Sequence, residues 1–284
     1  MVPDGQVKQR WVALDPRGDL QNFSILLERQ DAEIWRYAAE ARASGLTIKA
    51  ADGLPGFREV NAQLRIDSTS GRVALEADDS QIAWPEMLAD TIPVDKLEGV
   101  LVWRRSRDGV RIVGDDLVLS NADFSSRSSV ELTLPADGSS PVLDLDTGIA
   151  DVDIVVLKRY LPANRLKPGA YRWLKGSWEG GRIPRAQVSF FGPVAAFPFD
   201  DGEGQFRVAA DLDDGQLRFA PSWPPARGIQ ARVVIDNVAM DARVTGGSIL
   251  GSRIRQAGVQ FPDLRTGVLK VQATTEGPVQ SALD

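Results

Sequence analysis

The sequence predicts a mainly β protein built on a long antiparallel sheet. Most of the chain alternates apolar and polar residues with a period of two, which is typical of strands with one buried and one solvated face. Asp-Gly, Ser-Gly and Gly-Gly pairs separate these runs and indicate turns between antiparallel neighbours. Only residues 151–181 favour helix. We therefore expect a sheet with one short helical insertion.

The first candidate strand lies in a region of mixed propensity. Residues 28–44 are rich in Ala, Glu and Arg, which favour helix, and Gly45 stands where a helix C-cap would. Large and small apolar residues nevertheless occupy strictly alternate positions there, so we predict a strand from about Ile34 onward. These alternating residues are Trp35, Tyr37, Ala39, Ala41 and Ala43.

The later runs repeat the same alternation, and we take their apolar residues as candidates to line one apolar groove. These candidates are Ala62, Leu64, Ile66, Val73, Leu75, Val130, Leu132, Phe206, Val208, Val233, Ile235, Ala242, Val244, Leu269 and Val271. An ordinary dry core explains the alternation equally well, and the residues alone leave both readings open. The predicted turns fall at Ser70-Gly71, Asp108-Gly109, Asp137-Gly138, Asp214-Gly215 and Gly246-Gly247.

The helical insertion is expected to contain two short helices. Asp151 or Asp153 can cap the start of a helix over residues 154–161, and Pro162 ends it. Pro168 suits the first turn of the second helix.

An internal repeat indicates a modular arrangement. Residues 54–66 (LPGFREVNAQLRI) align without gaps with residues 223–235 (WPPARGIQARVVI), although two similar hairpins can arise by chance. We expect a first β unit over residues 1–150, the helical insertion over 151–181, and a second β unit over 182–284 that continues the same sheet.

Two absences in the composition exclude whole classes of site. The 284 residues include no His and no Cys, which excludes Ser-His-Asp and Cys-His nucleophiles, zinc fingers, haem attachment and iron–sulfur clusters. The net charge of −6 and the pI near 5.0 argue against nucleic acid, which needs a basic surface. We expect no cofactor, no tightly bound transition metal and no catalysis.

Two polar groups remain as candidates for chemistry. Paired carboxylates can hydrolyse glycosides or bind calcium, and arginines can hold lipid phosphate. Turn, cap and solvated-strand positions explain both groups, and we favour that structural interpretation. The acidic residues are Asp144, Asp146, Asp151, Asp153, Asp200, Asp201, Glu203, Asp211, Asp213 and Asp214, and the arginines are Arg104, Arg105, Arg107 and Arg111.

No segment predicts a membrane span or an export signal. The longest notable uncharged run, residues 188–199, has twelve residues and two prolines, whereas a spanning helix needs about 20 apolar residues. Residues 1–10 lack the apolar stretch of a signal peptide. Because the chain also begins abruptly, we expect an internal segment of a longer protein.

An ordered series of loose motifs covers nearly the whole chain, from about Leu14 to Leu283. It resembles the AsmA-like proteins of the YhdP type, large envelope proteins of Gram-negative bacteria. The motifs are Leu54-Pro55-Gly56-Phe57, residues 93–99 (PVDKLEG), 159–162 (RYLP), 172–174 (RWL), 180–183 (GGRI), 191–193 (FGP), 197–206 (FPFDDGEGQF), 223–225 (WPP) and 276–278 (EGP).

The resemblance implies a periplasmic segment of a protein anchored in the inner membrane elsewhere in its chain. Such proteins are expected to carry phospholipid between the inner and outer membranes along a hydrophobic groove in a strongly curved, trough-like β-sheet. The resemblance implies no catalytic residue and leaves other envelope partners unknown. The residues alone also allow a closed barrel or a sandwich. The alternatives in function are a sealed structural or interaction module and a carbohydrate-active enzyme.

Overall fold

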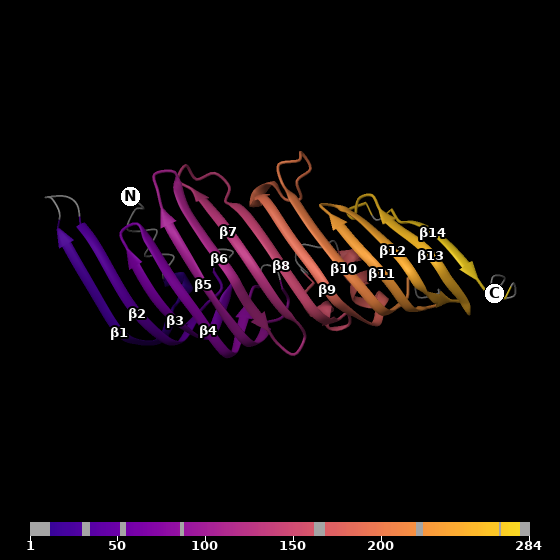
Figure 1. Cartoon of the computed structure of the whole chain (residues 1–284), viewed down its shortest axis with the longest axis horizontal. Coiled ribbons are helices and arrows are strands. Elements are labelled where there is room, and N and C mark those ends of the chain that lie inside the picture. The colour runs from indigo at the N-terminus through magenta and orange to yellow at the C-terminus, as the bar shows by residue number, and fades with distance from the viewer. Residues whose placement is uncertain are drawn as a thin grey trace. The chain divides into compact units, whose positions relative to one another are not determined.

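Strands dominate the structure and join in the order of the sequence. The computed structural model describes residues 12–29, 35–51, 55–85, 88–161, 168–219, 224–266 and 268–278. Within these residues, fourteen strands form one open sheet in the order β1 to β14 (Figure 1). The prediction of a mainly β, antiparallel architecture is confirmed.

The strands vary in length from 7 to 16 residues. The first seven are β1 (Arg17–Arg29), β2 (Trp35–Ile48), β3 (Gly56–Asp67), β4 (Ser70–Ala83), β5 (Ile92–Arg105), β6 (Gly109–Ser120) and β7 (Ser125–Pro135). The others are β8 (Val142–Asp153), β9 (Trp178–Pro193), β10 (Gln205–Leu217), β11 (Ala226–Asp236), β12 (Ala239–Ile249), β13 (Ser252–Phe261) and β14 (Lys270–Glu276).

The chain clusters into two compact units. Unit 1 comprises the residues up to Ala122 together with Ser126–Asp144, and it holds β1 to β6 and nearly all of β7. Unit 2 comprises Asp123–Ser125 and the residues from Leu145 onward, with most of β8 and all of β9 to β14.

Strand register gives unit 1 one apolar and one polar face. Residues directly opposite each other in an antiparallel pair project to the same side of the sheet. Leu64 lies opposite both Ala41 and Val73, and Val73 lies opposite Leu101. On β2 and β3 the intervening residues are polar, as in the ion pair between Arg65 and Glu40. The predicted alternation therefore becomes a two-faced sheet.

Unit 2 follows the same rule. Val233 lies opposite both Ala210 and Ala242 on the apolar face. On the polar face, Asp211 accepts hydrogen bonds from Arg185 at 3.1 Å and from Arg232 at 2.9 Å. One carboxylate thus links three neighbouring strands, β9, β10 and β11.

A row of bulges interrupts the strands near one end in each unit. Its members adopt left-handed backbone conformations, which Gly, Asn and Asp tolerate best, and the strand register shifts beside them. In unit 1 the row comprises Gly45, Glu59, Asp79 and Asp116, with φ between 54° and 61°. In unit 2 it comprises Asp151, Gly181, Asp214, Gly228 and Gly247. We call these residues the bulge row.

Two of the predicted turns are bulges inside strands instead. Asp214-Gly215 lies inside β10 and Gly246-Gly247 inside β12, so neither pair closes a hairpin. The prediction was wrong because an Asp-Gly or Gly-Gly pair supplies positive φ to a bulge as readily as to a turn. The turns at Ser70-Gly71, Asp108-Gly109 and Asp137-Gly138 are confirmed within a residue or two.

The internal repeat extends to the bulges. Glu59 and Gly228 occupy matching positions, and both are left-handed, with φ of 56° and 61°. The residue that follows each, Val60 or Ile229, is buried. Leu54 and Trp223 of the repeat lie outside the described residues.

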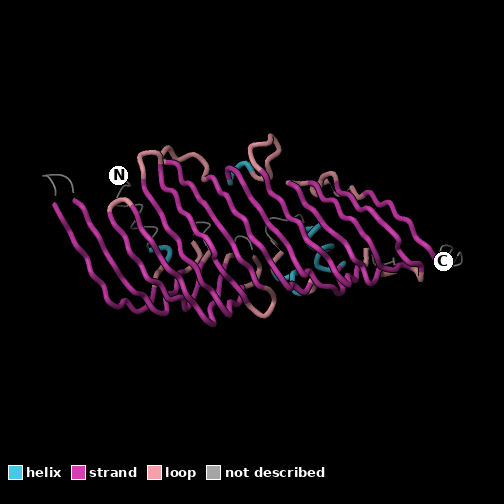
Figure 2. The backbone as a smooth tube through the Cα atoms, viewed as in Figure 1, coloured by secondary structure: helices cyan, strands magenta, loops and turns pink. Residues whose placement is uncertain are grey.

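The helical insertion is smaller than predicted. β8 continues through Asp153, and the first expected helix is only the 3-10 turn η1 (Val156–Arg159). The ladder continues because the Ile154 N–H donates to the Gly181 carbonyl at 3.0 Å. The second helix is confirmed as α2 (Pro168–Ser177). Figure 2 shows how short the helices are beside the strands.

The helical region leads directly into β9 and also contacts the segment after β10. Pro162 lies outside the described residues, and β9 already begins at Trp178. The Trp173 indole N–H donates to the Phe219 carbonyl at 3.0 Å, which fastens α2 to the segment after β10. The 3-10 turn η2 (Val194–Ala196) lies between β9 and β10.

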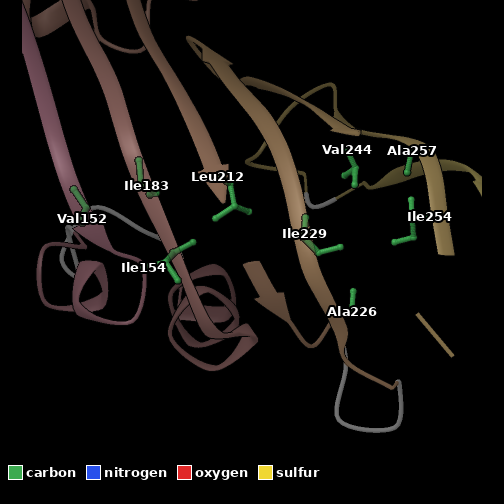
Figure 3. Packing of buried hydrophobic residues seen from close by; sticks show 9 residues of the cluster. All are labelled: Val152, Ile154, Ile183, Leu212, Ala226, Ile229, Val244, Ile254 and Ala257. Carbon is green, nitrogen blue, oxygen red and sulfur yellow. The ribbon is translucent and has the colours of Figure 1, made fainter. Parts of the chain in front are cut away.

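Buried apolar residues gather around the bulge row, near one end of the strands. In unit 1, Val60, Ala77 and Val94 are each only 1% exposed. In unit 2 the cluster comprises Val152, Ile154, Ile183, Leu212, Ala226, Ile229, Val244, Ile254 and Ala257 (Figure 3). Each unit is therefore packed mainly at one end of its strands.

Candidate functional site

The apolar face of unit 1 is only partly covered between the bulge row and the opposite strand ends. Ala62 is buried, whereas Leu64, Ile66, Val73 and Leu75 are half-buried. Solvent therefore reaches side chains that the alternation assigns to the apolar face. A fully sealed core would leave such aliphatic side chains almost without exposure.

The position of Glu131 shows that its neighbours on β7, Val130 and Leu132, lie on this face. Glu131 forms a two-fold hydrogen-bonded ion pair with Arg111, at 2.5 and 2.6 Å. Arg111 lies opposite Arg104 on the polar face. Because side chains alternate along a strand, Val130 and Leu132 project to the apolar face, where both are half-buried.

The candidates of unit 2 divide into buried, half-buried and exposed groups. Ala242 and Val244 are buried, and Phe206, Val208, Val233 and Ile235 are half-buried. Val271 lies in the outermost strand, β14, opposite Val259, and is 56% exposed. Leu269 precedes β14 and is also exposed. Except for Leu269, which has no strand partner among the described residues, these residues lie on one face of their strands and are covered unequally.

Two aromatic residues on the apolar face of unit 1, Trp103 and Tyr37, were missing from the predicted set. Trp103 of β5 lies across Gly71 of β4, so closely that a Cβ at position 71 would enter the indole ring. Tyr37 of β2 is also on this face, directly opposite Leu27. Their signal in the sequence is an aromatic residue at an alternating position near the end of a strand run.

A larger aromatic cluster occupies the corresponding end of β9 and β10. Phe197, in the loop between these strands, meets Phe206 edge-on with 5.6 Å between ring centroids. Phe190 lies directly opposite Phe206 on the apolar face. Phe199 is buried against Gly192 and Gly204 and anchors the loop. Half of the Phe197 surface remains exposed.

Several of the candidate acidic residues form ion pairs or hydrogen bonds with neighbouring side chains. Asp200 accepts a hydrogen bond from Arg265 at 2.9 Å, and Asp146 accepts one from Gln187. The pKa of Arg265 is raised because its guanidinium bonds to Asp263 and Asp200. Among the described residues, no group of three or more acidic side chains is arranged to hold a metal ion.

The candidate arginines lie on different faces of the sheet. Arg111 is paired with Glu131, and this hydrogen bond holds the pKa of the carboxyl below its usual range. Arg104 projects to the polar face opposite Arg111. Arg105, the next residue, is exposed and lies opposite Val110 on the side of the apolar face. Of these three arginines, Arg105 is the one that can reach a ligand on that face.

Comparisons with known proteins agree on one family. A family model described as "YhdP protein" matches residues 1–284. The chain is 22% identical over 268 residues to the "Intermembrane phospholipid transporter YhdP" of Escherichia coli strain K12. The match covers 94% of this chain and 21% of the relative, so the chain spans about a fifth of that protein's length. No solved structure gives a significant match.

In the part of the chain that the structure describes, every helix is too short or too polar to cross a bilayer.

Proposed function

We infer the function of this chain from its family and its apolar face: the chain belongs to the YhdP protein family. We propose that it is a segment of a periplasmic phospholipid transporter, and that its apolar face shields acyl chains from water during transfer between the inner and outer membranes. The full-length protein would be anchored in the inner membrane through a part outside this chain.

The half-buried aliphatic residues of the apolar face carry this proposal. Each square ångström of apolar surface left in water costs about 25 cal/mol, and a lipid tail laid on the face would remove that cost. Leu64, Val73 and Val233 are half-buried members of this face. The relative's name, an intermembrane phospholipid transporter, supplies the class of ligand.

The proposed role is non-catalytic and needs no cofactor. The chain lacks His and Cys, and the best acidic candidates form ion pairs, such as Asp211 with Arg185 and Arg232. Phospholipid and the two membranes are the proposed partners, and nucleic acid is not among them.

The test introduces a charge on the proposed lipid path. Ile66→Asp and Ile235→Asp place carboxylates on half-buried positions of the two units. A charge among lipid tails costs a few kcal/mol, whereas a partly solvated carboxylate leaves the fold intact. We expect both variants to keep a cooperative thermal melt but to lose most of the co-purified or photo-crosslinked phospholipid.

Gln63→Asp is the matched control, because Gln63 is exposed on the polar face of the same strand as Ile66. It should leave lipid recovery unchanged. Unfolding of both test variants, together with no lipid crosslinking to the wild-type protein from positions 66 and 235, would instead identify a sealed structural module.

A further inference from the structure

Polarity changes in a fixed order along the apolar face of β5. From the bulge row outward, the side chains on this face are Leu97, Leu101, Trp103 and Arg105. The order runs from aliphatic through aromatic to charged. The charged end lies next to the turn that leads to β6, at the strand end opposite the buried core.

The aliphatic-to-aromatic part of this order recurs in unit 2. On β10, Leu212 is buried, Val208 is half-buried, and Phe206 stands at the last position before the loop. On β13, Ala257 is buried and Phe261 ends the strand, opposite Met240. We call these terminal aromatic residues the rim aromatics: Tyr37 and Trp103 in unit 1, and Phe190, Phe206 and Phe261 in unit 2.

Aromatic side chains favour the boundary between hydrocarbon and water. Trp and Tyr gather at the headgroup level of membranes because their rings are apolar and their N–H or O–H needs a polar partner. Tyr37 is 41% exposed and Trp103 is half-buried, so neither ring is sealed in a core. This position suits the junction between the tails and the headgroup of a lipid.

The width of the face supports the same arrangement. Leu97 and Trp103 are six residues apart on one uninterrupted strand, which corresponds to about 20 Å at about 3.4 Å per residue. The hydrocarbon layer of one leaflet is about 15 Å thick, half of the bilayer core. The tails of one phospholipid therefore fit across the strands between the bulge row and the rim aromatics.

We propose that phospholipid lies across the strands with its tail ends toward the bulge row and its glycerol and headgroup at the rim aromatics. This orientation rests on the proposed function, since it concerns how the same lipid is held. In unit 1, Arg105 extends beyond Trp103 and is placed to meet the phosphate, a group that guanidinium binds well. The headgroup then remains in water along one defined edge of each unit.

Quenching of tryptophan by spin-labelled lipid tests the orientation. One variant keeps Trp103 alone, with the chain's six other tryptophans replaced by Phe. A second carries Leu97→Trp and Trp103→Phe in that background, which moves the reporter toward the bulge row on the same strand. The probes are phosphatidylcholines with a nitroxide near either the carboxyl end or the methyl end of one acyl chain. Circular dichroism and a cooperative melt confirm folding.

We expect the carboxyl-end nitroxide to quench Trp103 about twofold or more better than the methyl-end nitroxide, since up to about 15 Å of hydrocarbon separates the labels. The Leu97→Trp reporter should show the opposite preference. In unit 2, Phe206→Trp with Trp103→Phe should behave like Trp103, which keeps the test decisive if the Leu97→Trp variant fails to fold.

Two results would overturn the proposal and separate its failure from that of the function. Equal or reversed preferences, with clear quenching, would disprove the orientation but leave lipid binding in place. No quenching by either probe in any folded reporter variant would disprove the orientation and also the proposed function.

Discussion

Asp67 shows at the residue scale how one carboxylate closes a hairpin. It accepts hydrogen bonds from the Thr69 and Ser70 amides at 2.7 and 2.8 Å, and from both of their hydroxyls. These bonds favour the ionised form and hold the pKa of Asp67 well below its ordinary value of 3.8. The turn between β3 and β4 is thereby fixed by local chemistry.

The lowered pKa predicts an acid-sensitive contribution to stability. Because the folded pKa lies below the unfolded one, the contribution is complete above the unfolded value of 3.8 and disappears as pH falls through the lower folded value. We expect Asp67→Ala to lower the melting temperature at pH 7. Between neutral and strongly acidic pH, the melting temperature of this variant should also decrease less than that of the wild-type protein. Asp78→Ala, an exposed position on β4, is the control. Identical pH profiles for Asp67→Ala and the wild-type protein would contradict this account.

Gly71 tests a second single-residue requirement. A Cβ at this position meets the Trp103 ring, which must then move. Such overpacking costs about 1–3 kcal/mol, so Gly71→Ala should lower the free energy of unfolding by that amount and change Trp103 fluorescence. Gly258→Ala is the control, since nothing lies within 4 Å of its added methyl group. Equal urea midpoints for Gly71→Ala and Gly258→Ala would show that the Trp103 ring moves aside without lowering the free energy of unfolding.

At the element scale, the apolar face of β10 and β11 is buried beside the bulge and less covered farther along the strand. β11 has its bulge at Gly228, near one end, and the environment of the isoleucines that follow depends on their distance from it: Ile229, next to the bulge, belongs to the buried cluster, while Ile235 is half-buried near the far end of the strand. β10 follows the same plan around Asp214. A bulge adds twist and bends the strand. The packed residues of β10 and β11 lie beside the bulge, and the exposed apolar part lies farther along each strand.

The left-handed bulge at Asp214 predicts a sharp dependence on residue type. A β-branched residue at positive φ costs about 1–2 kcal/mol, whereas Gly adopts it without strain. Asp214→Val should therefore lower the free energy of unfolding by about 1–2 kcal/mol, and Asp214→Gly should leave it nearly unchanged. Denaturant unfolding measures both. A well-tolerated Val would mean that β10 can lose its bulge at no cost.

At the scale of the whole molecule, stability and proposed function occupy different parts of the same sheet. The buried clusters at one end of the strands hold each unit together, and the half-buried residues face the proposed lipid. Among the described strands, β1 and β14 are the outermost. In both units, the covering of the apolar face therefore varies along the strands.

This separation predicts unequal costs for the same substitution in one strand. Ile229→Ala empties a site that is only 6% exposed and should cost about 2–5 kcal/mol. Ile235→Ala removes a half-buried side chain and should cost less than half as much while reducing phospholipid recovery. Urea unfolding and lipid quantification test the pair. Equal stability losses would indicate that the apolar face is sealed throughout.

The sequence by itself determined the features that depend on nearest neighbours. Period-two alternation is local, so it correctly placed Leu64, Val73 and Val233 on apolar strand faces. The repeat likewise aligns Glu59 with Gly228, and both residues have a left-handed backbone. The family resemblance followed from ordered motifs and agrees with the family match over the whole chain.

Tertiary structure alone decided which apolar residues are covered. Ile229 and Ile235 have the same parity in one strand, yet only Ile229 is buried, because elements distant in sequence pack around that end of β11. It also decided that Asp214-Gly215 is a bulge, since strand pairing on both sides continues past it. Burial and pairing depend on neighbours brought together by folding, which a local pattern does not contain.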